Sequence, residues 1–168
     1  KNNEIEIGAG TSLLKFEKYI KRFYSDFGVV LKRYGSVQIR NVGTIAGNIA
    51  TASPIGDTLP LLLSLDAKIL LDSAKKRITM PLNKFFISYR KTKLQEGQFI
   101  YSVKIPIYKK NIFKAYKISK RFDDDISSIC GSFNVEIFKN QIKKIKIAYG
   151  GMSEIPKRAL NTEKILIN

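Results

Sequence analysis

The stretch from Ile39 to Asp57, IRNVGTIAGNIATASPIGD, is the part of the sequence that most constrains the fold. It contains three glycines, two threonines and no lysine, and its only formal charges are Arg40 and Asp57. The whole chain has 30 lysines and arginines against 14 aspartates and glutamates. Such a stretch in a basic chain indicates either a tight structural turn or a backbone that must come close to a ligand.

The composition is typical of a folded domain. The chain has 168 residues, 44% hydrophobic and 11% aromatic, which is enough for a buried core. Its longest apolar run, around Leu59–Leu65, is far too short to span a membrane, so we expect no membrane association. The single cysteine, Cys130, excludes an internal disulfide and indicates a reducing, cytoplasmic location. Without histidine, the chain has no ordinary zinc or iron–sulfur ligand set, and we expect no metal site.

A net charge of +16 raises the alternative of a basic nucleic-acid-binding module, because phosphate contacts need clustered lysine and arginine. The lysines are instead scattered along the whole chain. The densest cluster, KNQIKKIKIAYGG, alternates polar and apolar residues at period two, the pattern of a strand with one solvated face. Solvated lysines are the better interpretation, and we expect no nucleic-acid partner.

An α+β fold is predicted by the hydrophobic periodicity. Residues 12–34 have apolar side chains at helical spacing, with a possible restart at Ser25 or Asp26. Three further helices are predicted, at residues 57–67, at 81–92 and in the tail from 156 onward. Six strands are predicted, at residues 67–73, 76–80, 98–107, 113–121, 126–138 and 143–151. Near residues 108–111 the predicted elements change from mixed helices and strands to consecutive strands. This change predicts a boundary between a unit of helices and strands and a meander of antiparallel strands.

The glycines of the opening stretch would suit an anion. Gly43 and Gly47 allow positive φ and close approach of the backbone to a phosphate, and nearby hydroxyls add donors. Asp57 could accept hydrogen bonds from sugar hydroxyls. The stretch is neither a P-loop nor a G-x-G-x-x-G fingerprint, and on the glycines alone a tight structural turn is the better interpretation.

Four blocks of sequence carry a family resemblance. IRNVGTIAGNIATASPIGDTLP, FFISYRKT, KISKRFDDDIS and AYGGM occur in this order. Together they resemble the FAD-binding domain of xanthine dehydrogenases, which are molybdenum hydroxylases, and most closely the bacterial form. The resemblance implies an α+β fold related to the vanillyl-alcohol oxidase flavoproteins. It also implies a fragment lacking both ends of the flavoprotein unit. Residues 1–107 would form the later part of the FAD-binding domain, and residues 112–168 the start of a C-terminal unit with a three-stranded antiparallel sheet and helix.

The resemblance also implies which residues bind FAD. The predicted cofactor-binding residues are Tyr34, Gly43, Thr44, Gly47, Asn48, Thr51, Asp57, Ile100 and Lys117. Thr44, Gly47, Asn48 and Thr51 would hold the pyrophosphate, and Lys117 would lie near the flavin, where positive charge favours the anionic reduced ring. Judged on their own, Tyr34 and Ile100 could equally be core side chains.

The block KRFDDDIS contains three adjacent carboxylates. Without the resemblance it would be read as a solvated loop or a divalent-cation turn. In the family this loop lies beside the flavin and influences access and reactivity toward NAD. Asp124 is therefore the candidate nearest the ring, with Arg121 as its counter-charge, and Tyr89 and Arg90 are candidates for the NAD side. Core packing and a helix C-terminal cation are the alternatives for the last two.

The resemblance implies a function in electron transfer. It identifies no certain catalytic residue in this chain. A molybdenum cofactor on a large subunit would hydroxylate a purine, and [2Fe–2S] clusters in an upstream domain or separate subunit would pass electrons to FAD and then to NAD. Three alternatives stay open: the flavin subunit of an aldehyde, CO or heterocycle hydroxylase; another flavoprotein reductase of the same broad fold; and the nucleic-acid-binding module.

Overall fold

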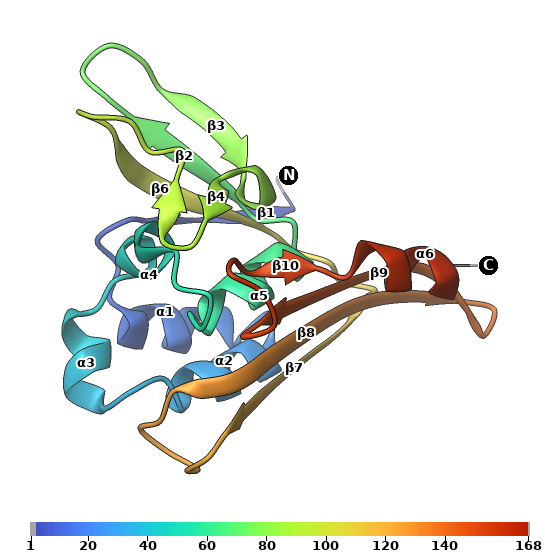
Figure 1. The fold of residues 1–168 in the computed structure, drawn as a ribbon. Helices are drawn as coiled ribbons and strands as arrows, with labels where there is room; N and C mark the ends of the chain where they lie inside the picture. The colour runs from blue at the N-terminus through green and yellow to red at the C-terminus, as the bar shows by residue number, and fades with distance from the viewer. Residues whose placement is uncertain (1–2, 168) are drawn as a thin grey trace.

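The computed structural model describes residues 3–167, which form two four-stranded antiparallel sheets with helices between them and one small two-stranded sheet (Figure 1). The first sheet has the order β1 (Glu4–Gly8), β6 (Phe99–Pro106), β2 (Lys68–Asp72), β3 (Ile78–Pro81). The second has the order β10 (Lys157–Arg158), β9 (Gln141–Gly150), β8 (Ser127–Phe138), β7 (Ile112–Ser119). The predicted α+β class is therefore confirmed.

The helices follow one another along the first half of the chain. They are α1 (Leu13–Ile20), α2 (Ser25–Lys32), α3 (Val37–Val42), α4 (Ile45–Thr51) and α5 (Thr58–Ser64), and α6 (Leu160–Leu166) packs on β9 near the end. Helix α4 contacts β6 of the first sheet, whereas α2 and α5 contact the second sheet. The core therefore lies where the helices face both sheets, and no helix of residues 3–167 is long and apolar enough to cross a membrane.

The predicted helical region 12–34 consists of two helices. The Ser12 hydroxyl caps α1 by accepting from the Lys15 N–H at 3.4 Å, and Phe16 and Phe27 bury their rings edge to face at 5.4 Å. A Cβ at Gly28 would lie 2.6 Å from the Lys21 Cβ. Glycine at this position lets α2 lie close against the end of α1.

The predicted helix over residues 81–92 is wrong. The segment has one 3₁₀ turn, Leu82–Lys84, followed by the short strands β4 (Phe86–Ser88) and β5 (Lys91–Thr92). Arg90 sits in the turn between the strands with a left-handed φ of 53°. Burial of the aromatic rings in FFIS and the preference of such residues for strands override the helical spacing.

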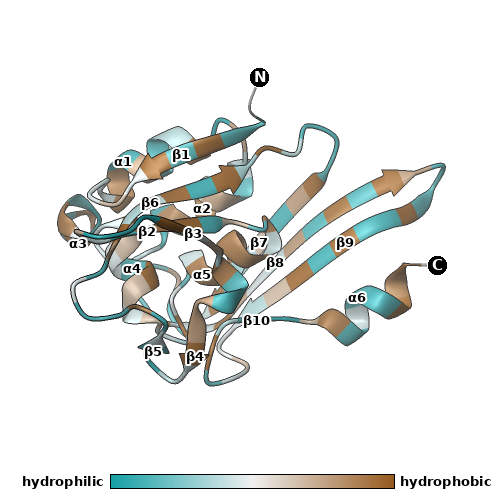
Figure 2. Cartoon of the chain, turned by 90° about the horizontal axis from the view of Figure 1, so that it is seen from above, coloured by the Kyte–Doolittle hydropathy of each residue, from teal (hydrophilic) through white to brown (hydrophobic). Residues whose placement is uncertain are grey.

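Strands β1 and β10 were not predicted. The alternation in Glu4–Gly8 is a strand pattern, and β1 pairs along its whole length with β6. The two-residue strand β10 adds a fourth strand to the predicted three of the second sheet. Hydrophobic and hydrophilic residues alternate along β8 and β9, as expected for strands with two different faces (Figure 2).

The chain passes from the first sheet to the second through residues 107–111, and Tyr24 holds this connection. The Tyr24 hydroxyl donates to the Pro106 carbonyl at 2.7 Å and accepts from the Tyr108 N–H at 3.0 Å. Burial raises the pKa of the Tyr24 hydroxyl to about 12, so it remains a donor at neutral pH. The predicted boundary lies in this connection, and the division into two units stays a prediction.

Replacing Tyr24 by phenylalanine is expected to lower the free energy of unfolding by about 1–3 kcal/mol, because a part-buried carbonyl and a part-buried N–H lose their shared partner. Urea titration measures the change. Tyr19→Phe, at the surface of α1, is the matched control and should have little effect. Equal stabilities for both variants would contradict the assigned role of Tyr24.

Candidate functional site

A pocket of about 540 Å³ opens where the helices meet loops from both halves of the chain. Its size is within the usual range of ligand pockets, about 300–1,000 Å³. All of the predicted site residues except Ile100 and Tyr89 line it: Tyr34, Gly43, Thr44, Gly47, Asn48, Thr51, Asp57, Arg90, Lys117 and Asp124. Residues predicted from four separate stretches of sequence thus lie around one cavity.

The glycine-rich stretch is mostly helical, not a loop. The Thr44 hydroxyl caps α4 by accepting from the Gly47 N–H at 3.0 Å, and the helix ends at Ala52 with a left-handed φ of 48°. Gly47 and Asn48 therefore lie in the first turns of α4, on the wall of the pocket. Neither Gly43 nor Gly47 has a positive φ, so that part of the expectation is wrong.

The two glycines have different roles. A Cβ at Gly43 would lie 2.9 Å from the Ile39 carbonyl oxygen, so the turn between α3 and α4 itself needs a glycine. A Cβ at Gly47 would meet only the Thr44 Oγ1, at 3.0 Å, and no other atom within 4 Å. The space beside Gly47 is therefore open, and a ligand can reach the backbone there.

A buried ion pair forms one wall of the pocket. The Lys117 ammonium donates to Asp57 Oδ2 at 2.6 Å, and the two side chains are only 2% and 4% exposed. The Ser127 hydroxyl donates to the other carboxylate oxygen, Oδ1. Asp57 precedes α5, Lys117 lies on β7 and Ser127 opens β8, so the ion pair joins the helices to the second sheet.

Tyr34 joins the pocket through a chain of hydrogen bonds. The Asn48 side-chain amide donates to the Tyr34 hydroxyl at 2.9 Å, and the Thr58 hydroxyl donates to Asn48 Oδ1. Burial and the nearby Asp57 carboxylate raise the pKa of Tyr34, so its hydroxyl keeps its proton at neutral pH. Tyr34 and Asn48 both line the pocket, where they present polar groups to a ligand.

Arg33 holds the acidic loop between β7 and β8. Its guanidinium donates to the Lys117 carbonyl at 2.8 Å and to the Phe122 carbonyl at 2.9 Å, and it lies 4.5 Å from the Phe122 ring centre. Within the loop, Asp125 accepts the N–H groups of Arg121 and Ile126, each at 2.8 Å. The hydrogen bond from the Arg121 N–H stabilises the charged carboxylate and is the main reason that the pKa of Asp125 lies below its usual range.

The acidic loop has a defined shape that the sequence did not indicate. Asp124 lines the pocket with a left-handed φ of 51°. Among residues 3–167 Asp124 forms no ion pair, and the expected pairing with Arg121 is not seen. Arg33 and Ser127 were missed because neither an arginine at a helix end nor a serine after DDDI stands out in this composition.

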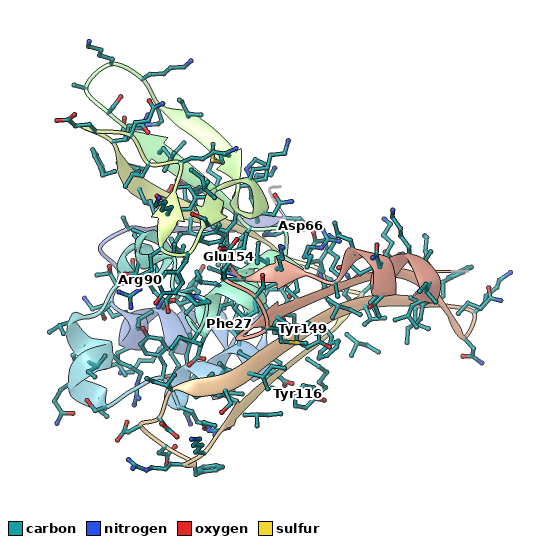
Figure 3. The ribbon with its side chains drawn as sticks, viewed as in Figure 1. Phe27, Asp66, Arg90, Tyr116, Tyr149 and Glu154 are labelled. Atoms are coloured by element: carbon teal, nitrogen blue, oxygen red, sulfur yellow. The ribbon has the colours of Figure 1, made fainter. Side chains whose placement is uncertain are left out.

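The remaining predicted residues lie apart from the cavity wall. Ile100 is 5% exposed in the core, opposite Leu71, and Tyr89 is at the surface with Arg90 5.7 Å from its ring centre. Their contacts with FAD and NAD stay predictions. Arg90 itself lines the pocket from the β4–β5 turn and is labelled in Figure 3. Over the described part of the chain, no group of His, Cys, Asp and Glu could hold a metal ion.

Two family models match this sequence. Residues 1–108 match the FAD-binding domain in molybdopterin dehydrogenase, and residues 114–168 match the CO dehydrogenase flavoprotein C-terminal domain. The chain belongs to this family of FAD-binding domains of molybdenum hydroxylases, so the predicted resemblance and its cofactor are confirmed.

Relatives and solved structures agree with this family. Xanthine dehydrogenase from Emericella nidulans is 33% identical over 98% of this chain, which spans 13% of that relative. Nicotinate hydroxylase hnxS from the same organism is 39% identical over 73% of the chain, which spans 10% of that protein. The structure of carbon monoxide dehydrogenase from Hydrogenophaga pseudoflava superposes with a TM-score of 0.94 at 22% identity, over 100% of this chain and 59% of that one. This structural likeness shows the fold.

Gly47→Val is expected to abolish FAD retention without unfolding the chain, because the added side chain would fill the space open to the ligand. Flavin content of the purified full-length protein, with circular dichroism for the fold, measures this. Gly8→Val is the matched control, since an added Cβ at Gly8 would meet no atom within 4 Å and Gly8 lies on β1, outside the pocket lining. Full FAD occupancy in Gly47→Val would contradict the placement of the cofactor at α4.

Proposed function

We propose that this chain holds FAD in the 540 Å³ pocket and delivers electrons from iron–sulfur clusters to NAD within a xanthine dehydrogenase-like enzyme. The observation that carries the proposal is the pocket itself, which is lined by the open Gly47, the helix-capping hydroxyl of Thr44 and the buried Lys117. The family match names the cofactor, and the position of each group suggests where its parts bind.

The pyrophosphate is proposed to lie at the start of α4. The Thr44 hydroxyl accepts from Gly47 N–H, so its own proton is available to donate to a phosphate oxygen. The Thr51 hydroxyl donates to the Gly47 carbonyl at 2.8 Å, which makes it a weaker candidate donor. Open space beside Gly47 and the Thr44 donor together suit an anion close to the backbone.

Asp57 is proposed to act mainly through Lys117. Both carboxylate oxygens already accept hydrogen bonds from side chains of the second sheet, which leaves less capacity for FAD hydroxyls than the resemblance implies. The pair presents the Lys117 ammonium to the pocket with its charge largely balanced. When bound, FAD supplies the redox chemistry, and this chain binds, orients and electrostatically tunes it.

The whole enzyme is proposed to have parts beyond this chain. A molybdenum-binding large subunit and an iron–sulfur domain or subunit would supply electrons, with a cytoplasmic location and with units at 1–107 and 112–168 in this chain. The matches to residues 1–108 and 114–168 support that division. A heterocycle hydroxylase is the second candidate, since a nicotinate hydroxylase is among the relatives. The flavin domain alone would not distinguish the two, because the molybdenum subunit would choose the substrate.

Arg90 and Asp124 are proposed to face NAD. They come from the β4–β5 turn and the β7–β8 loop, carry opposite charges and line the same pocket as the phosphate-binding groups. Tyr89 lies next to Arg90 at the surface, 55% exposed, where it could contact the dinucleotide outside the cavity. NAD is bulky and would contact these loops, whereas dioxygen is small enough to reach the flavin without contacting them.

Asp124→Ala is expected to change the rate of NAD reduction several-fold while leaving purine hydroxylation with a dye acceptor nearly unchanged. Removing one charge close to the flavin, in a partly solvated site, is expected to change a rate by about tenfold at most. Steady-state rates of the full-length enzyme with NAD, dioxygen and the dye measure the effect.

The matched control for this comparison is Asp123→Ala. Asp123 is the neighbouring carboxylate, but it does not line the cofactor pocket. Equal losses with all three acceptors would mean that Asp124 is structural, and the absence of any change would place the loop away from NAD. A full-length protein that contains no flavin would refute the proposed function as a whole.

A further inference from the structure

We propose that Ser127 is a positioning residue for the flavin: it fixes the Asp57 carboxylate and, through it, the Lys117 ammonium against the cofactor pocket. The inference rests on the proposed binding of FAD in this pocket. It assigns a role to Ser127, for which the family resemblance implied none.

Ser127 is buried in direct contact with the ion pair. Ser127 is only 3% exposed. Its hydroxyl donates to Asp57 Oδ1, while the Lys117 ammonium donates to Oδ2. All three residues line the pocket. A carboxylate held at one oxygen can rotate about its Cβ–Cγ bond, whereas a donor at each oxygen fixes its plane.

An irregularity in the sheet directs Ser127 toward the pair. The register of β7 and β8 shifts at this point: Ile118 pairs with Ile129, but Ser119 pairs with Ser127, which leaves Ser128 as an extra residue. Along regular β8, the residues that face α5 are even-numbered, as Ser132 and Asn134 show by their bonds to Ser64. The bulge brings odd-numbered Ser127 to this buried face and leaves Ser128 exposed, as bulges beside functional sites often re-aim a side chain.

The consequence for the flavin is electrostatic. Without the Ser127 hydroxyl, Asp57 Oδ1 would be a buried charged oxygen without its donor, and the carboxylate would turn toward the more polar pocket. That motion brings negative charge closer to the cofactor and loosens the ammonium. Because the reduced ring carries negative charge, its formation becomes less favourable and the reduction potential of bound FAD falls.

The test is an anaerobic redox titration of FAD bound to the full-length protein. Ser127→Ala is expected to shift the oxidised-to-reduced equilibrium about tenfold toward the oxidised form, or about 30 mV for a two-electron couple. Ser127→Thr keeps the hydroxyl and should restore the native potential. Ser127→Cys, with a weak S–H donor, should fall between them and decides the question if the alanine variant does not fold.

The matched control is Ser132→Ala, which removes a buried hydroxyl from the same strand, one bonded at 2.6 Å to Ser64 and not lining the pocket. It should leave the potential unchanged. A native potential in both Ser127→Ala and Ser127→Cys, or the same shift in Ser132→Ala, would overturn the role of Ser127. Retention of FAD by Gly47→Val would instead refute the proposed cofactor placement, so the two failures are distinguishable.

Discussion

The ion pair between Asp57 and Lys117 is the interaction on which the geometry of the pocket depends. It links the connection between α4 and α5 to β7, and Ser127 extends the link to β8. Burying two charges is costly unless each is paired and hydrogen-bonded, and here both carboxylate oxygens have a donor. A change in any of the three side chains therefore alters both the joint between the halves and the wall that a cofactor meets.

Around this joint, the pocket combines groups that the fold brings from distant parts of the sequence. Thr44 and Gly47 come from a helix start, Arg90 from a tight turn, and Asp124 from a loop that Arg33 holds in place. The helix supplies the anion-compatible side, and the two loops supply charges of opposite sign. If the proposed assignments hold, the loops can affect the electron acceptor without disturbing the pyrophosphate that we propose lies at α4.

Sequence reasoning was most successful where a pattern repeats or where blocks resemble a family. The long strands and the α1–α2 pair follow from periodicity. Ten residues that the family resemblance predicted for the site line one pocket, and their contacts with FAD and NAD stay predictions. It failed over residues 81–92, where buried Phe85 and Phe86 make a hairpin out of an apparently helical spacing. It also missed Ser127, since a bulge that redirects one side chain depends on pairing across the sheet and leaves no local pattern.

The most direct test of this account is a double-mutant cycle on the dissociation constant of FAD in the full-length protein, with Asp57→Leu, Lys117→Met and the double variant. Each single change leaves an unpaired buried charge at the pocket and is expected to weaken FAD binding at least about a hundredfold. The double variant removes both charges, so its loss should be far smaller than the product of the two single losses. Single effects that simply multiply would show that Asp57 and Lys117 act independently and would contradict the central role of the pair.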